Sequence, residues 1–85
     1  MHLYYILVRS STYASKVSKI LAAEGYKTKC IKSPSRLNVG GCGHAVIVKN
    51  GNISRIIELI SSAGMPDFKI FLTPDGKSFK EVYRF

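Results

Sequence analysis

Hydrophobic side chains follow one another closely in four short segments of the chain. Residues 3–8 and 45–49 are apolar at nearly every position, which is typical of strands buried on both faces. Residues 26–32 place lysines between smaller side chains, so we expect this strand near an edge of the sheet with one face in water. Residues 68–72 supply a fourth predicted strand.

A first segment with helical spacing of its apolar residues covers residues 12–24. Ser11 or Thr12 is the expected cap, and Gly25 follows where a left-handed residue commonly ends a helix. The predicted buried stripe consists of Tyr13, Ala14, Val17, Ile20 and Leu21.

A second helical segment begins after Asn52, a good capping residue, and ends at Gly64. Its predicted stripe consists of Ile53, Ile56, Ile57, Ile60 and Ala63. Residues 78–85 show neither the apolar spacing of a helix nor the alternation of a strand. They are predicted to form a short appendage of undefined structure.

These elements predict the βαββαβ order of a ferredoxin-like α+β fold, which is a four-stranded antiparallel sheet with two helices on one face. We expect residues 1–85 to form a single domain, with a core of residues 3–72 and a C-terminal appendage of residues 73–85. The face without helices would carry apolar side chains from both central strands. We therefore expect a homodimer, unless the appendage folds over that face.

The composition restricts the class of protein. The chain has 85 residues, of which 46% are hydrophobic, enough for one small core and too many for a disordered tail. No apolar run approaches the ~18 residues of a membrane span, and the N-terminus lacks the basic region and cleavage site of a signal peptide. We expect a soluble, cytoplasmic protein that does not bind membranes.

The charge is strongly positive and uneven. The formal net charge is +8, and residues 1–36 hold seven basic side chains and one acidic one. Such an excess attracts anions, so one hypothesis is a small non-enzymatic binding or regulatory module for RNA or another anionic partner. However, RNA-recognition sheets place aromatic side chains on both central strands, and residues 43–49 contain none. RNA binding by that route is disfavoured.

The sequence patterns of common enzyme and metal sites are missing. The two cysteines do not form a Cys-x-x-Cys pair or a cluster with histidine at zinc spacing, so we expect no metal. There is no Gly-x-Ser-x-Gly elbow, no phosphate-binding loop of the Walker type and no carboxylate pair for acid–base hydrolysis. We expect no resident cofactor.

One irregular segment, residues 33–44, has the composition of a functional site. Gly40, Gly41 and Gly43 surround Cys42, and they allow positive φ values that bring several amides to one point. Such amides stabilise an anion, and a thiolate or persulfide on Cys42 is one, so the pKa of this thiol is expected to fall. The alternative is an ordinary hairpin loop with an incidental cysteine.

Other residues of this segment and its surroundings have candidate roles. His44, two residues after Cys42, would point to the same side along an extended chain and favour the thiolate, although a solvated loop histidine is the alternative. Pro34 and Arg36 would orient the loop, with Arg36 as a partner for an anion. Cys30 is predicted to be a small apolar strand residue, which acts as a second thiol only if the fold brings it near Cys42.

Three patterns occur in order along the chain: Tyr-Tyr-Ile-Leu at 4–7, a capped helix closed by Gly25, and Pro-x-Arg-Leu at 34–37 followed by Cys-Gly-x-Ala at 42–45. Together they resemble the selenium/sulfur carrier protein-like family of small bacterial proteins, over residues 3–72. The resemblance implies that Cys42 carries sulfur or selenium as a persulfide-like adduct. It also implies sulfur- or selenium-donating and accepting enzymes as partners, and a carrier rather than a stand-alone enzyme.

The chain departs from the family pattern in three places, one of which is a longer tail after Thr73. Lys32 stands where members often have a proline, and the pair Gly40-Gly41 replaces the more usual serines. These departures affect the geometry of the loop and the identity of the partner more than the role of Cys42.

Overall fold

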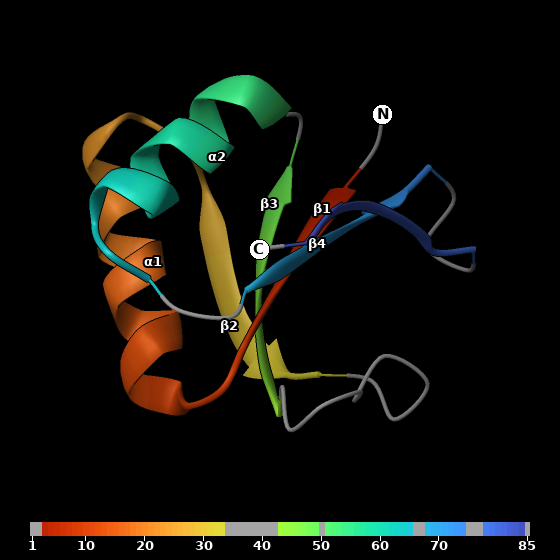
Figure 1. Ribbon diagram of the computed structural model, residues 1–85, viewed down its shortest axis with the longest axis horizontal. Helices are drawn as coiled ribbons and strands as arrows, with labels where there is room; N and C mark the ends of the chain where they lie inside the picture. The colour runs from red at the N-terminus through yellow and green to blue at the C-terminus, as the bar shows by residue number, and fades with distance from the viewer. Residues whose placement is uncertain (1–2, 34–42, 50, 66–67, 75–77, 85) are drawn as a thin grey trace.

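The computed structural model describes residues 3–33, 43–49, 51–65, 68–74 and 78–84. Its elements are, in chain order, β1 (Leu3–Val8), α1 (Ser11–Ala23), β2 (Thr28–Lys32), β3 (His44–Lys49), α2 (Ile53–Ser62), β4 (Lys69–Thr73) and β5 (Lys80–Arg84). The strands form one antiparallel sheet in the order β2-β3-β1-β4-β5, and both helices pack on the same face (Figure 1). The α+β class and the two helices are confirmed, as is the edge position of β2.

The first six elements follow the predicted βαββαβ order, but the four-stranded prediction is wrong for the whole sheet, because residues 80–84 form a fifth strand beside β4. The pairing of β4 with β5 is irregular: Ile70 lies opposite Tyr83 and Phe71 opposite Glu81, which leaves Val82 as an extra residue. Such a bulge breaks the alternation that identifies a strand in a sequence. The bulged Val82 is correspondingly exposed, at 37%.

Both helices begin at side-chain caps. Ser10 Oγ accepts a hydrogen bond from Tyr13 N at 3.3 Å, so α1 starts slightly earlier than predicted. Asn52 Oδ1 accepts from Arg55 N at 3.2 Å, as the sequence predicted for the second helix. After each helix a glycine adopts a left-handed conformation, with φ of 91° at Gly25 and 73° at Gly64, and these two ends are confirmed.

The main core lies between the helices and the sheet. The buried faces of α1 and α2 supply Ala14, Val17, Leu21, Ile56 and Ile60 to it. The sheet supplies alternate residues of β1 and β3, such as Ile6 and Val46, and Phe68 stacks on Tyr83 of β5 with ring centroids 5.2 Å apart. Burial of these side chains is the main force that holds the helices on the sheet.

The opposite face of the sheet carries a second, smaller apolar cluster. Leu7 and Ala45 are fully buried there and pack with Tyr5, Ile31, Phe71 and Phe79. Because Ile6, Leu7 and Val8 are all completely buried, the prediction that β1 is covered on both faces is confirmed. Phe79, just before β5, packs edge-to-face against Tyr5 at 5.1 Å, so part of the predicted appendage contacts this face.

Candidate functional site

Two of the predicted site residues, Gly43 and His44, belong to the part of the chain that the structure describes. The others lie outside the described residues: Pro34, Arg36, Gly40, Gly41 and Cys42. The site is therefore described from the residues that border the segment 34–42.

The two ends of that segment are joined by a backbone hydrogen bond. Ser33 N donates to Gly43 O at 3.1 Å, directly after the last register pair of the β2–β3 ladder, Lys32 opposite His44. The chain thus leaves the sheet at Ser33 and returns beside it at Gly43. Cys42 is covalently joined to this anchored end of the hairpin.

Gly43 does not adopt the left-handed conformation that the predicted amide nest would use. Among the described glycines, positive φ values occur at Gly25 and Gly64. A Cβ atom added to Gly43 would meet no atom of the described residues within 4 Å. This glycine therefore contributes neither a positive φ nor a close approach to the loop.

His44 is the first residue of β3 and lies on the helix-covered side of the sheet. It stands opposite Val8 of β1 in the register, and Val8 belongs to the main core. The Nδ1 atom of His44 is buried and has no hydrogen-bond partner in the structure as described. A buried polar atom without a partner is uncommon in folded proteins and calls for an explanation.

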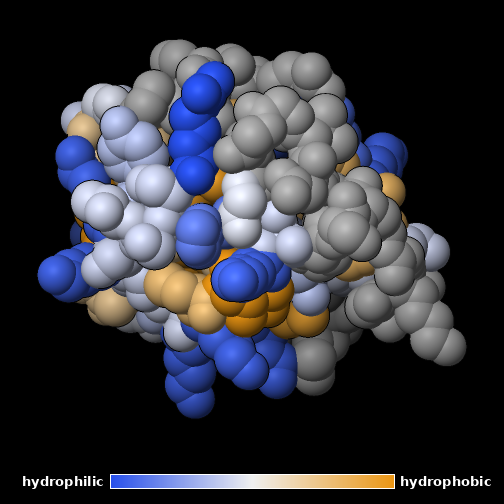
Figure 2. Space-filling view, turned by 90° about the horizontal axis from the view of Figure 1, so that it is seen from below, coloured by the Kyte–Doolittle hydropathy of each residue, from blue (hydrophilic) through white to orange (hydrophobic). Residues whose placement is uncertain are grey.

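A hollow of about 310 Å³ opens beside His44, between the first half of α1 and the edge strand β2. Its lining comes from three elements: Ser11, Ala14 and Ser15 of α1, Cys30, Ile31 and Lys32 of β2, and His44 of β3. Figure 2 shows the molecule from below, with strongly hydrophilic side chains around a small apolar area beside the grey residues. The fold thus places a thiol, an imidazole, an ammonium group and two hydroxyls around one concave surface.

Cys30 lies in a strand, as predicted, and its exposed side chain lines this hollow. The reason is that β2 is an edge strand, and its helix-covered side is only partly closed by α1. The Sγ atom lies 3.7 Å from Ala14 O, to which it donates a weak hydrogen bond. Cys30 therefore shares a surface with His44, which lies two residues after Cys42.

A family model described as "Putative Se/S carrier protein-like" matches residues 3–72. The chain belongs to this family. No curated protein and no solved structure gave a significant match. The matched range of this Se/S carrier-like protein contains the whole of β1 to α2, the segment 34–42 with Cys42, and nearly all of β4.

The surroundings of the site in this Se/S carrier-like protein are cationic. Lysine side chains are exposed on α1, on β2 and directly before β2: Lys16, Lys19, Lys27, Lys29 and Lys32. The acidic residue nearest to them in sequence, Glu24, is engaged by Arg55. Lys32 lines the hollow, and Lys16 and Lys19 share a neighbouring surface with Ser11 and Ser15, so the field beside the hollow favours an anion.

The described residues contain no group of three His, Cys, Asp or Glu side chains that is arranged to bind a metal. None of the helices described is long and apolar enough to cross a membrane. The parts of the site that the sequence did not suggest are Ser11 and Ser15. No sequence signal groups them with Cys30, because they reach this thiol only when α1 packs on β2.

Proposed function

We propose that this protein is a sulfur or selenium carrier in which Cys42 holds the transferred atom. The observation that carries the proposal is the family match, which spans Cys42 and the strands on both sides of it. The Ser33–Gly43 hydrogen bond supports it, because it fixes the residues on either side of the segment with Cys42 beside each other at one end of the sheet.

The chemistry is an exchange between sulfur atoms. The Cys42 thiolate attacks the outer sulfur of a donor persulfide, the sulfur–sulfur bond of the donor breaks, and the donor leaves as a thiolate. Cys42 then carries a persulfide, whose outer sulfur a thiolate of the accepting enzyme removes by the same reaction. A donor with a sulfur–selenium bond would load selenium in the same way, without a further oxidant or reductant.

The cationic end of the molecule supports this chemistry, because the thiolate is the reactive form of cysteine and positive groups favour it. Lys32 and His44 stand opposite each other at the foot of the hairpin, where an ammonium and an imidazole are close to the segment with Cys42. In this proposal the protein acts in the cytoplasm between donating and accepting enzymes and completes no reaction alone.

The test is mass spectrometry after incubation with a cysteine desulfurase and cysteine. Cleavage after arginine separates the thiols, because Cys30 falls in the peptide 10–36 and Cys42 in the peptide 37–55. We expect one added sulfur atom on the peptide 37–55 of the wild type and of Cys30→Ser, and none on that peptide in Cys42→Ser. An unmodified Cys42 after treatment with sulfur and with selenium donors would contradict the proposal.

The alternative, a binding module for RNA or another anionic partner, draws on one observation. The five lysines between residues 16 and 32 are exposed and lie within one third of the chain. This alternative gives Cys42 no role, so the two hypotheses differ in what Cys42→Ser should do.

A further inference from the structure

We propose that Cys30 is a second sulfur-accepting thiol, loaded directly by a low-molecular-weight persulfide that binds in the hollow between α1 and β2. This proposal deepens the carrier function proposed above and rests on it for the kind of sulfur donor. It concerns a different thiol and a small donor molecule in place of a donor protein, so the two can fail separately.

The first argument is the accessibility of the thiol. Cys30 is exposed on an edge strand, and its Sγ has only a weak contact with Ala14 O at 3.7 Å. It opens into a hollow and not onto flat surface, so a molecule that reaches it is contacted by α1 as well as by β2. The position combines a nucleophile with a binding surface.

The second argument is the unsatisfied imidazole. His44 lines the same hollow, and its buried Nδ1 lacks a partner among the described residues. Since this nitrogen is out of contact with solvent, a polar group of a ligand in the hollow would supply that partner once the imidazole ring turns toward it. The cost of leaving a buried polar atom without a hydrogen bond would then be removed when the ligand binds.

The third argument concerns the charge and size of the ligand. Lys32 follows Cys30 by two residues on the same strand and lines the hollow, where Ser11 and Ser15 add hydroxyl groups. An ammonium with two hydroxyls suits a carboxylate or a persulfide anion. A volume of about 310 Å³ is at the small end of ligand pockets, which fits an amino-acid persulfide.

The reaction in the hollow balances without a further reagent. The Cys30 thiolate attacks the outer sulfur of the bound persulfide, and a new bond forms between that sulfur and Sγ. The sulfur–sulfur bond of the donor breaks, and the donor leaves as a thiolate with the electron pair. The proton of the outer sulfur stays with it or passes to solvent, and Cys30 becomes a persulfide.

The test uses cysteine persulfide as the probe and the Cys42→Ser protein as the substrate. We expect one added sulfur atom on the peptide 10–36, with a rate that saturates as the probe concentration rises. Modification of Cys42 in the wild type together with an unmodified Cys30 in both proteins would overturn the inference and leave the carrier function intact. Modification of Cys30 with an unreactive Cys42 would support the inference alone.

Two lysine variants of matched position separate binding in the hollow from simple exposure. Lys29 and Lys32 are both exposed on β2, but only Lys32 of the pair lines the hollow. In the Cys42→Ser background, Lys32→Ala should slow modification of Cys30 on the order of tenfold at low probe concentration, and Lys29→Ala should leave it nearly unchanged. Equal rates in the two variants, or a rate that never saturates, would show that Cys30 reacts only as an exposed thiol.

Discussion

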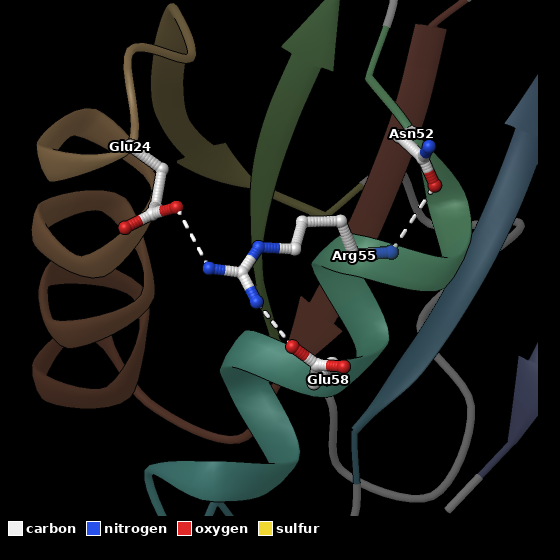
Figure 3. A network of polar contacts seen from close by, with 4 residues as sticks. All are labelled: Glu24, Asn52, Arg55 and Glu58. Atoms are coloured by element: carbon white, nitrogen blue, oxygen red, sulfur yellow. Dashed lines mark hydrogen bonds and ion pairs between the residues drawn. The ribbon is translucent and has the colours of Figure 1, made fainter.

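Arg55 joins the two helices through Glu24, with 3.0 Å between Nη2 of the arginine and Oε1 of the glutamate (Figure 3). The same guanidinium contacts Glu58 one turn along α2, and the Arg55 backbone amide is bonded to the Asn52 cap. The hydrogen bond and the charge of Glu24 raise the pKa of the Arg55 side chain above its ordinary value. The pair therefore connects the C-cap of α1 to the first turn of α2.

A double-mutant cycle with Arg55→Gln and Glu24→Gln should give a small favourable coupling in the free energy of unfolding. Both side chains are well exposed, so the coupling should shrink as salt is added. Because the folded-state pKa of Arg55 is raised, its contribution is present below the ordinary arginine pKa and is lost only at still higher pH. Denaturant unfolding at two salt concentrations measures the coupling, and a value that does not respond to salt would contradict this account.

Gly51 should resist substitution and Gly43 should tolerate it. A Cβ atom at Gly51 would lie 2.5 Å from Ile56 Cδ1 and 3.1 Å from Val48 Cγ1, and both of these side chains are fully buried. We expect Gly51→Ala to cost about 1–3 kcal/mol through this overpacking. Gly43→Ala meets open space without a left-handed backbone, so it should change stability by less than about 1 kcal/mol. Thermal unfolding of the two variants makes the comparison, and equal losses would refute it.

The Cys42 thiol should react as a thiolate near neutral pH. In a Cys30→Ser background, alkylation rates against pH should give an apparent pKa for Cys42 below the ~8.5 of a free cysteine. Gly41→Val should raise that pKa and slow the reaction at neutral pH, because the added side chain restricts the backbone beside the sulfur. An ordinary pKa that Gly41→Val does not change would indicate a plain hairpin loop.

Salt dependence separates the carrier from the RNA-binding alternative. We expect weak binding of tRNA, which Cys42→Ser does not strengthen or weaken. If the lysines between residues 16 and 32 made about five phosphate contacts, the affinity would fall roughly a hundredfold or more between about 50 and about 200 mM salt. Filter binding measures this slope, and tight binding with such a slope would favour the alternative.

The sheet face without helices should mediate a homodimer. Tyr5, Ile31 and Phe71 are only partly buried on that face, although Phe79 packs against Tyr5. Tyr5→Lys would place a charge in the interface, so it should shift the protein to the mass of a monomer. Light scattering after gel filtration tests this, with Lys19→Ala as a control at an exposed position of α1, outside the sheet face. A monomeric wild type would exclude the homodimer.

Local patterns of the sequence predicted most of the helices and strands, because helix caps, terminal glycines and apolar runs each involve only a few neighbouring residues. The Asn52 cap begins α2, and the left-handed glycines at 25 and 64 end the two helices. The uninterrupted apolar run of β1 reflects its burial on both faces of the sheet. The lysines of β2 likewise marked an edge strand. The family was also recognisable from short motifs, and the family match over residues 3–72 confirms it.

Tertiary structure decided the rest, because it depends on residues that are distant in the chain. The fifth strand forms by pairing with β4 through a bulge at Val82, which removes the alternation that a sequence pattern needs. The exposure of Cys30 follows from how far α1 covers the edge of the sheet, and its hollow unites Ser11, Cys30 and His44 from three separate elements. The identity of one residue does not show which distant residues will lie beside it. The packing of α1 on the sheet therefore decided which side chains surround the Cys30 thiol.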